Sequence, residues 1–86
     1  MKARNKYAWR FEGVCPINGG VDNYFATLEM EGMVVVEDLL EYCEKRRGTP
    51  TFQEDWAKGL CEAFGGKVVL RCHHRGGVLI ESECEL

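Results

Sequence analysis

The architecture of this chain is decided between residues 7 and 30, which read YAWRFEGVCPINGGVDNYFATLEM. Large apolar side chains occupy alternate positions on both sides of a central break: Tyr7, Trp9 and Phe11 before it, and Tyr24, Ala26, Leu28 and Met30 after it. A period of two is typical of strands that bury one face. The break holds Pro16, Asn18 and the pair Gly19-Gly20, which are turn residues. The stretch therefore predicts two strands separated by a turn-rich loop.

The next segment changes to a helical period. Apolar residues recur with the spacing i, i+3, i+4 and i+7: Val36, Leu39, Leu40 and Cys43. This spacing predicts a helix over residues 35–46. The basic run at residues 45–47 suits the C-terminal end of a helix dipole, and Gly48 is a natural stop.

A second helix is predicted after Pro50, because Thr51-Phe52-Gln53-Glu54 has the form of a capping box. Apolar side chains then repeat every four residues: Phe52, Trp56, Leu60 and Phe64. Residues 67–74 and 78–84 are two more predicted strands, joined across Arg75-Gly76-Gly77. The order strand, strand, helix, helix, strand, strand predicts an α+β fold. A four-stranded antiparallel sheet with two helices on one face would bury both apolar helix stripes.

Length and composition point to a single small domain spanning residues 1–86. The chain is 45% hydrophobic and 29% charged, and no stretch reaches the roughly 18 apolar residues of a membrane span. No apolar run follows the first residues, so we expect no secretory signal and a cytoplasmic location away from membranes. A domain of this size is marginally stable alone, and oligomerisation is a common remedy.

The charge pattern excludes a general nucleic-acid-binding protein. The net charge is −3, from 14 acidic and 11 basic residues, whereas binding to phosphates requires a basic face. Two short basic clusters are typical of a solvated surface: Lys2, Arg4 and Lys6, and Lys45, Arg46 and Arg47.

The cysteines favour free thiols rather than disulfides. They are odd in number, with no expected secretory signal: Cys15, Cys43, Cys61, Cys72 and Cys84. The single Cys/His cluster is Cys72-His73-His74. Neighbours in a strand point to opposite faces, and further ligands would have to come from elsewhere, so no metal site is predicted.

The stretch from Cys15 to Thr27 resembles the signature loop of the QueF family, which comprises 7-cyano-7-deazaguanine reductases and their amidinotransferase relatives. Members carry a pattern like C-P-x-T-G-Q-P-D before a strand reading F-A-T, and the matching positions here are Cys15, Pro16, Gly19 and Asp22. Phe52-Gln53-Glu54-Asp55 looks like the family's F-H-E-D, and Arg75-Gly76-Gly77-Val78 looks like its R-G-G-I. The three motifs follow the family's order and the element order of its tunnelling fold (T-fold).

The resemblance implies a chemistry for three residues. Cys15 would add as a thiolate to a nitrile carbon and give a covalent thioimide, which splits one hard step into two easier ones. Asp22 would protonate the nitrile nitrogen as a general acid. Glu54 would accept hydrogen bonds from the N–H edge of the purine-like ring.

Each of these residues also has a structural alternative. Cys15 could be an incidental small residue, Asp22 a turn residue beside glycine, and Glu54 part of the capping box. Arg75, His73 and His74 are assigned no role, although either histidine could replace the histidine of F-H-E-D, where this chain has Gln53.

Departures from the family pattern bear on the second step of the reaction. The family's reductases carry a helix motif like E-S-K-S-x-K, whose lysines are associated with the NADPH phosphate. Residues 37–42 hold no lysine and add acids, which repel a phosphate. We therefore expect ammonia addition without a cofactor, on the base within tRNA or DNA. The alternatives are NADPH-dependent reduction of 7-cyano-7-deazaguanine and a non-catalytic T-fold binding subunit.

The resemblance also implies an assembly. T-fold subunits close into ring-like barrels that stack. We expect a homo-oligomer, a pentamer or a decamer of paired rings, with active sites between subunits.

Overall fold

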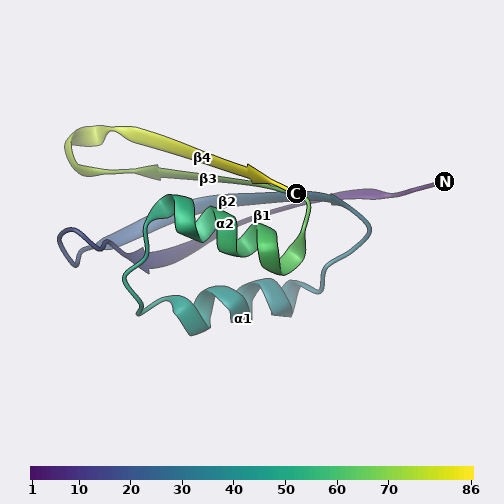
Figure 1. The fold of residues 1–86 in the computed structure, drawn as a ribbon, viewed down its shortest axis with the longest axis horizontal. Helices are drawn as coiled ribbons and strands as arrows, with labels where there is room; N and C mark the ends of the chain where they lie inside the picture. Colours follow the sequence, from purple (N-terminus) through teal and green to yellow (C-terminus); the bar gives the residue numbers. More distant parts are fainter.

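The computed structural model describes residues 1–86 and shows a four-stranded sheet with both helices on one side (Figure 1). The elements follow the predicted order: β1 Arg4–Val14, β2 Val21–Glu31, α1 Val36–Arg46, α2 Gln53–Phe64, β3 Lys67–His73 and β4 Leu79–Glu85. A short 3-10 turn, Arg75–Gly77, joins the last two strands. The sheet order is β1-β2-β3-β4, and each pair is antiparallel. The predicted α+β architecture is therefore confirmed.

The alternating patterns set the face of the sheet that the helices cover. From the second strand, Tyr24, Ala26 and Leu28 are buried, as their period of two predicted. They pack with residues of the other elements: Leu39, Cys43, Trp56, Ala57, Leu60, Cys61, Val68, Leu70 and Cys72. Pairing between β2 and β3 covers only Phe25 to Glu29 on β2. The strands therefore part at one end of the sheet, where Asp22 and His74 lie.

The apolar stripe of α1 is wider than the part that is buried. Leu39 and Cys43 are buried, whereas Val36 and Leu40 are about half exposed. The reason is that α1 lies beside the edge strand β1, where Val36 and Leu40 border a shallow hollow with Tyr7. α2 occupies the position over β3 and β4.

The capping box predicted at Thr51 is wrong. The N-cap of α2 is Phe52, and no side-chain hydrogen bond caps the helix. The hydroxyl of Thr51 donates instead to the carbonyl of Thr49 at 2.8 Å. The helix begins one residue later than the box requires, because the backbone N–H of Thr51 is bonded to the carbonyl of Val14 at 3.1 Å. This tether holds the start of α2 against the end of β1, and Phe52 is left half exposed rather than buried.

The other face of the sheet carries cross-strand ion pairs and no covering layer. Arg71 and Glu81 are 2.8 Å apart, and Lys67 and Glu83 are 3.1 Å apart. Such exposed pairs contribute little to stability. All five cysteines are free thiols. Neither helix has the length and apolar character needed to cross a membrane.

Candidate active site

The three residues singled out in the sequence line one cleft at the end of the sheet where β2 and β3 part. Cys15, Asp22 and Glu54 border a cavity of about 320 Å³, together with Gln53, His74 and Ile80. Cys15 and Asp22 come from the β1–β2 hairpin, whereas Glu54 comes from the first turn of α2. The tether between Thr51 and Val14 brings these two parts of the chain together.

The loop that carries Cys15 is closed by its own backbone. The N–H of Cys15 donates to the carbonyl of Gly20 at 2.8 Å, and the N–H of Gly19 donates to the carbonyl of Cys15 at 2.9 Å. Gly19 has a φ of 72°, which favours glycine. The side chain of Asn18 accepts from the N–H of Gly20 at 2.8 Å. The loop therefore fixes the backbone of Cys15 and leaves its thiol half-buried at the cleft.

Asp22 lies on the same face of β2 as the buried Tyr24, and its side chain is 13% exposed. One oxygen, Oδ2, accepts a hydrogen bond from the hydroxyl of Tyr24 at 3.3 Å. Burial, followed by the negative charge of Asp22, raises the pKa of Tyr24 well above its usual value. The phenol therefore stays protonated and remains a donor to Asp22. The other oxygen, Oδ1, lies 3.9 Å from Nδ1 of His74.

Gln53 organises the floor of the cleft. Its side-chain amide donates to the carbonyls of Leu70 at 3.1 Å and Ile80 at 2.9 Å, and so joins α2 to both β3 and β4. Its Oε1 lies 2.8 Å from Nε2 of His74. Because both amide hydrogens are occupied, the oxygen must accept, and Nε2 of His74 carries the hydrogen. The free nitrogen of that ring, Nδ1, then faces Asp22.

Glu54 is exposed in the first turn of α2, at the positive end of the helix dipole. The capping role considered for it does not occur, since no side-chain hydrogen bond caps this helix. Its carboxylate is thus available at the cleft to accept hydrogen bonds from a ligand.

The structure separates the two histidines, whose placement the sequence left open. His73 is exposed, and Arg75 is also exposed and does not line the cleft. His74 lines the cleft with a side chain that is 24% exposed. The sequence signal for the inward position of His74 was the period of two, which puts His74 on the same face as the buried Cys72.

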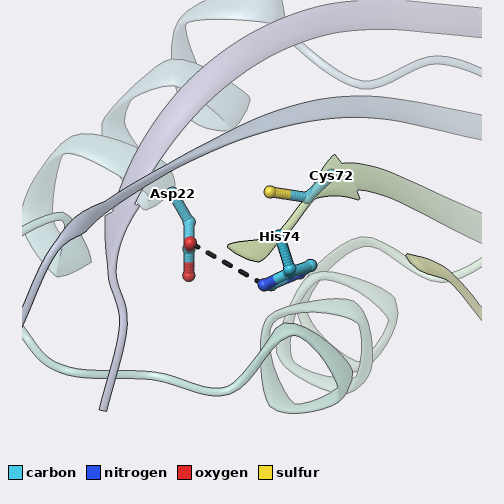
Figure 2. Close-up of side chains that lie close together, drawn as sticks. All are labelled: Asp22, Cys72 and His74. Atoms are coloured by element: carbon cyan, nitrogen blue, oxygen red, sulfur yellow. Dashed lines mark ion pairs between the residues drawn. The ribbon is translucent and has the colours of Figure 1, made fainter. Parts of the chain in front are cut away.

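Cys72 is a second thiol near Asp22, and it is 3% exposed. Burial raises its pKa, and the negative charge of Asp22 adds to that effect. Ligand atoms of Asp22, Cys72 and His74 all lie within 4.8 Å of one another. Figure 2 shows the three side chains directed toward a common point. The sequence did not predict this cluster, because Asp22 comes from a distant strand.

Comparisons with known proteins identify the fold. No family model matches the chain, and no curated protein matches it. A solved structure does match: the crystal structure of the archaeosine synthase QueF-Like in the apo form. The TM-score is 0.88 at 22% sequence identity, and the match covers 98% of this chain and 93% of that one. The chain therefore has the fold of that QueF-Like protein, as the motifs led us to expect.

Proposed function

We propose that this protein is an enzyme that adds ammonia to the nitrile of a 7-cyano-7-deazaguanine base through a thioimide on Cys15. The observation that carries the proposal is the meeting of Cys15, Asp22 and Glu54 in one cleft. These residues match the motifs of the QueF family, and the chain has the fold of a protein described as an archaeosine synthase.

The first step forms a carbon–sulfur bond. The Cys15 thiolate attacks the nitrile carbon, one π bond of the nitrile breaks, and its electron pair takes a proton at nitrogen. Asp22 lies in the cleft with Cys15, takes up the proton that the Cys15 thiol loses, and supplies it to the nitrile nitrogen as a general acid. Ammonia then adds to the thioimide carbon, and loss of the thiolate leaves an amidine. The net reaction joins one nitrile and one ammonia, with no oxidation or reduction.

Glu54 provides the recognition in this proposal. A guanine-type ring presents adjacent N–H donors on one edge, and an exposed carboxylate accepts them well. Phe52 and Ile80 line the same cleft, and both have exposed apolar surface for a flat ring to contact. We assign the ring edge to Glu54 and the nitrile to Cys15.

Reduction by NADPH is the second candidate for the later step. The surface of α1 fits an NADPH phosphate poorly, because Glu37 and Asp38 are exposed acids in its first turn. Lys45 at the other end is paired with Glu41 at 2.7 Å. The test is to offer NADPH and ammonium separately to the thioimide form. Formation of an amine coupled to NADPH oxidation would establish the reductase instead.

A base within tRNA or DNA is the proposed form of the substrate. One subunit offers few free cations for this: Lys2 and Arg4 pair with Glu31 and Glu29, and Arg47 pairs with Glu44. A ring of subunits would have to gather the remaining cations into a basic rim. Comparison of the free base with a base in RNA or DNA, at low and high salt, tests this.

Mass spectrometry after incubation with 7-cyano-7-deazaguanine tests the thioimide step, on which the proposal rests. The protein should gain one covalent adduct, which Cys15→Ala abolishes. The matched control is Cys84→Ser, because Cys84 is also half-buried but lies outside the Cys15 cleft. An unmodified wild-type protein would instead favour the non-catalytic binding subunit.

A further inference from the structure

Asp22, Cys72 and His74 form a cluster of three potential metal ligands, and the proposed chemistry uses only one of them. Their ligand atoms are one oxygen, one sulfur and one nitrogen, all within 4.8 Å of one another. Asp22 is the second residue of β2. Cys72 is the last residue but one of β3, and His74 directly follows that strand. The three side chains converge from two separate strands (Figure 2).

The hydrogen bonds around His74 leave a gap in the cluster. Oε1 of Gln53 accepts the hydrogen of Nε2, so Nδ1 is the ring nitrogen left to bind a metal, and it faces Oδ1 of Asp22. The separation of 3.9 Å is too long for a direct hydrogen bond. Two electron-rich atoms that face each other at this distance favour a cation between them.

Zinc fits the donor atoms and the spacing. Bonds from zinc to nitrogen and carboxylate oxygen are about 2.0–2.2 Å, and those to sulfur about 2.3 Å. Around a tetrahedral zinc ion these bond lengths place the ligand atoms about 3.3–3.7 Å apart. Nδ1 of His74 and Oδ1 of Asp22, 3.9 Å apart, are close to that spacing, and pairs separated by up to 4.8 Å reach it through rotations of the side chains. A mixture of imidazole, thiolate and carboxylate favours zinc over magnesium or calcium, which prefer oxygen ligands.

The surrounding residues provide the outer contacts that metal ligands usually have. Nε2 of His74 donates to Gln53, which is itself held by two strand carbonyls. The hydroxyl of Tyr24 donates to the second oxygen of Asp22. Such partners orient ligands, and their loss typically lowers metal affinity about 10- to 100-fold.

From these observations we propose that Asp22, Cys72 and His74 form a zinc-binding site whose fourth position opens into the Cys15 cleft. Asp22 and His74 line the cleft, so the ion can enter from that side. The site does not depend on the proposed function, since Cys72 and His74 take no part in thioimide formation. In the proposed mechanism, zinc and the nitrile would compete for Asp22, and zinc would therefore inhibit the enzyme.

Titration of the reduced protein with Co²⁺, followed by displacement with Zn²⁺, tests the site. We expect one equivalent of cobalt, with a near-ultraviolet thiolate-to-cobalt band and the strong visible bands of four-coordination. Cys72→Ser and His74→Asn should lose these signals, while Cys15→Ala should keep them. Tyr24→Phe should keep the spectrum and weaken affinity about 10- to 100-fold.

Circular dichroism without metal identifies any variant that fails to fold. His74→Asn is the variant least expected to disturb folding, because His74 is the least buried of the three proposed ligands. No thiolate band in the wild type, or a band that depends on Cys15 and survives in His74→Asn, would overturn the proposal. The adduct assay separates the two proposals. Folded Cys72→Ser should still form the Cys15 adduct and should no longer be inhibited by zinc. Cobalt binding without any adduct would leave this site standing and reject the enzyme.

Discussion

At the scale of single residues, Gln53 determines how the cleft is built. It stands where the QueF-family motif F-H-E-D has a histidine. Its side-chain amide donates two hydrogen bonds to strand carbonyls and accepts one from His74. A histidine at position 53 has only two ring nitrogens and could not make all three bonds. The imidazole of this cleft comes instead from His74, the first residue after β3.

Asp22→Asn should slow thioimide formation and spare substrate binding. The amide keeps the size of the side chain and can still accept from Tyr24, but it cannot supply a proton. General acid–base catalysis typically contributes about 10²–10⁴-fold, so the rate of adduct formation should fall by that factor. Mass spectrometry over time gives the rate, and calorimetry gives the affinity. An unchanged rate would remove Asp22 from the mechanism.

Glu54→Gln should weaken binding of the base rather than alter folding. One ring donor would then face an amide, at a cost of about 1.5–3 kcal/mol for a hydrogen bond to a charged group. Stability should fall by at most the helix-dipole contribution of about 0.3–1 kcal/mol, because Glu54 forms no cap.

The matched control for Glu54→Gln is Asp55→Asn, which removes a charge from the same helical turn at a residue that does not line the cleft. Equal loss of binding in both variants would show a general charge effect and would contradict the role proposed for Glu54.

The sequence predicted part of the site because some of its information is local. Cys15 and Asp22 lie on one hairpin, and the motifs marked Glu54. The contacts of Gln53 with Leu70 and Ile80 join three elements, and no spacing in the chain encodes such contacts. Periodicity showed that Cys72 and His74 share a face, but the packing of the folded sheet decides that this face is the inner one.

At the scale of elements, the strands were easier to predict than the ends of the helices. Alternation over Tyr7–Phe11 and Tyr24–Met30 gave the strands correctly, because one buried face imposes a strict period. The start of α2 was misplaced, because the tether of Thr51 to Val14 competes with a capping box. The half-exposed Leu40 likewise reflects where α1 lies beside β1, which is a tertiary property.

Gly66→Ala should disrupt the passage from α2 into β3. Gly66 has a φ of 70°, and an added Cβ would overlap the backbone carbonyl oxygen of Glu29. Gly76→Ala is the control, since Gly76 has a φ of 79° but open space around it. Both variants suffer backbone strain, and the overlap should cost Gly66→Ala about 1–3 kcal/mol more. Urea denaturation measures the difference, and equal stabilities would contradict this close contact.

At the scale of the whole molecule, buried thiols should make stability depend on alkaline pH. Burial, followed by interaction with Cys84, raises the pKa of Cys61 from 9.0 to about 11. Above pH 9 the unfolded chain loses this proton first, so the folded state binds more protons. The free energy of unfolding should therefore be fully retained below pH 9 and fall as the pH rises toward about 11.

Urea denaturation under reducing conditions across this pH range measures the alkaline effect. Burial raises the pKa of Cys43 and Cys72 as well, which adds to the slope. In Cys61→Ala the free energy of unfolding should fall less steeply with rising pH. A stability that is flat or rises across this range would contradict the prediction.

The open edges of the sheet agree with the homo-oligomer that the T-fold resemblance implies, a pentamer or a decamer. β1 and β4 each lack a neighbour on one side, and Val78 and Leu79 are exposed at the start of β4. The Cys15 cleft lies beside this edge through Ile80, so a neighbouring subunit would complete it. Light scattering at micromolar concentration measures the mass. Leu79→Lys should dissociate the assembly, with the exposed Met33→Lys as control. A folded wild-type monomer would reject the assembly.

The order of the strands also has a consequence for how the protein folds. β1–β2 and β3–β4 are local hairpins, whereas β2 and β3 are separated by both helices. Because long loops cost more entropy to close, the β2–β3 pairing should form last. Cys15 and Asp22 then meet early in the first hairpin, before α2 arrives to cover them. During that interval the Cys15 thiol is open to oxidants, so newly made chains should reach the native state in higher yield under reducing conditions.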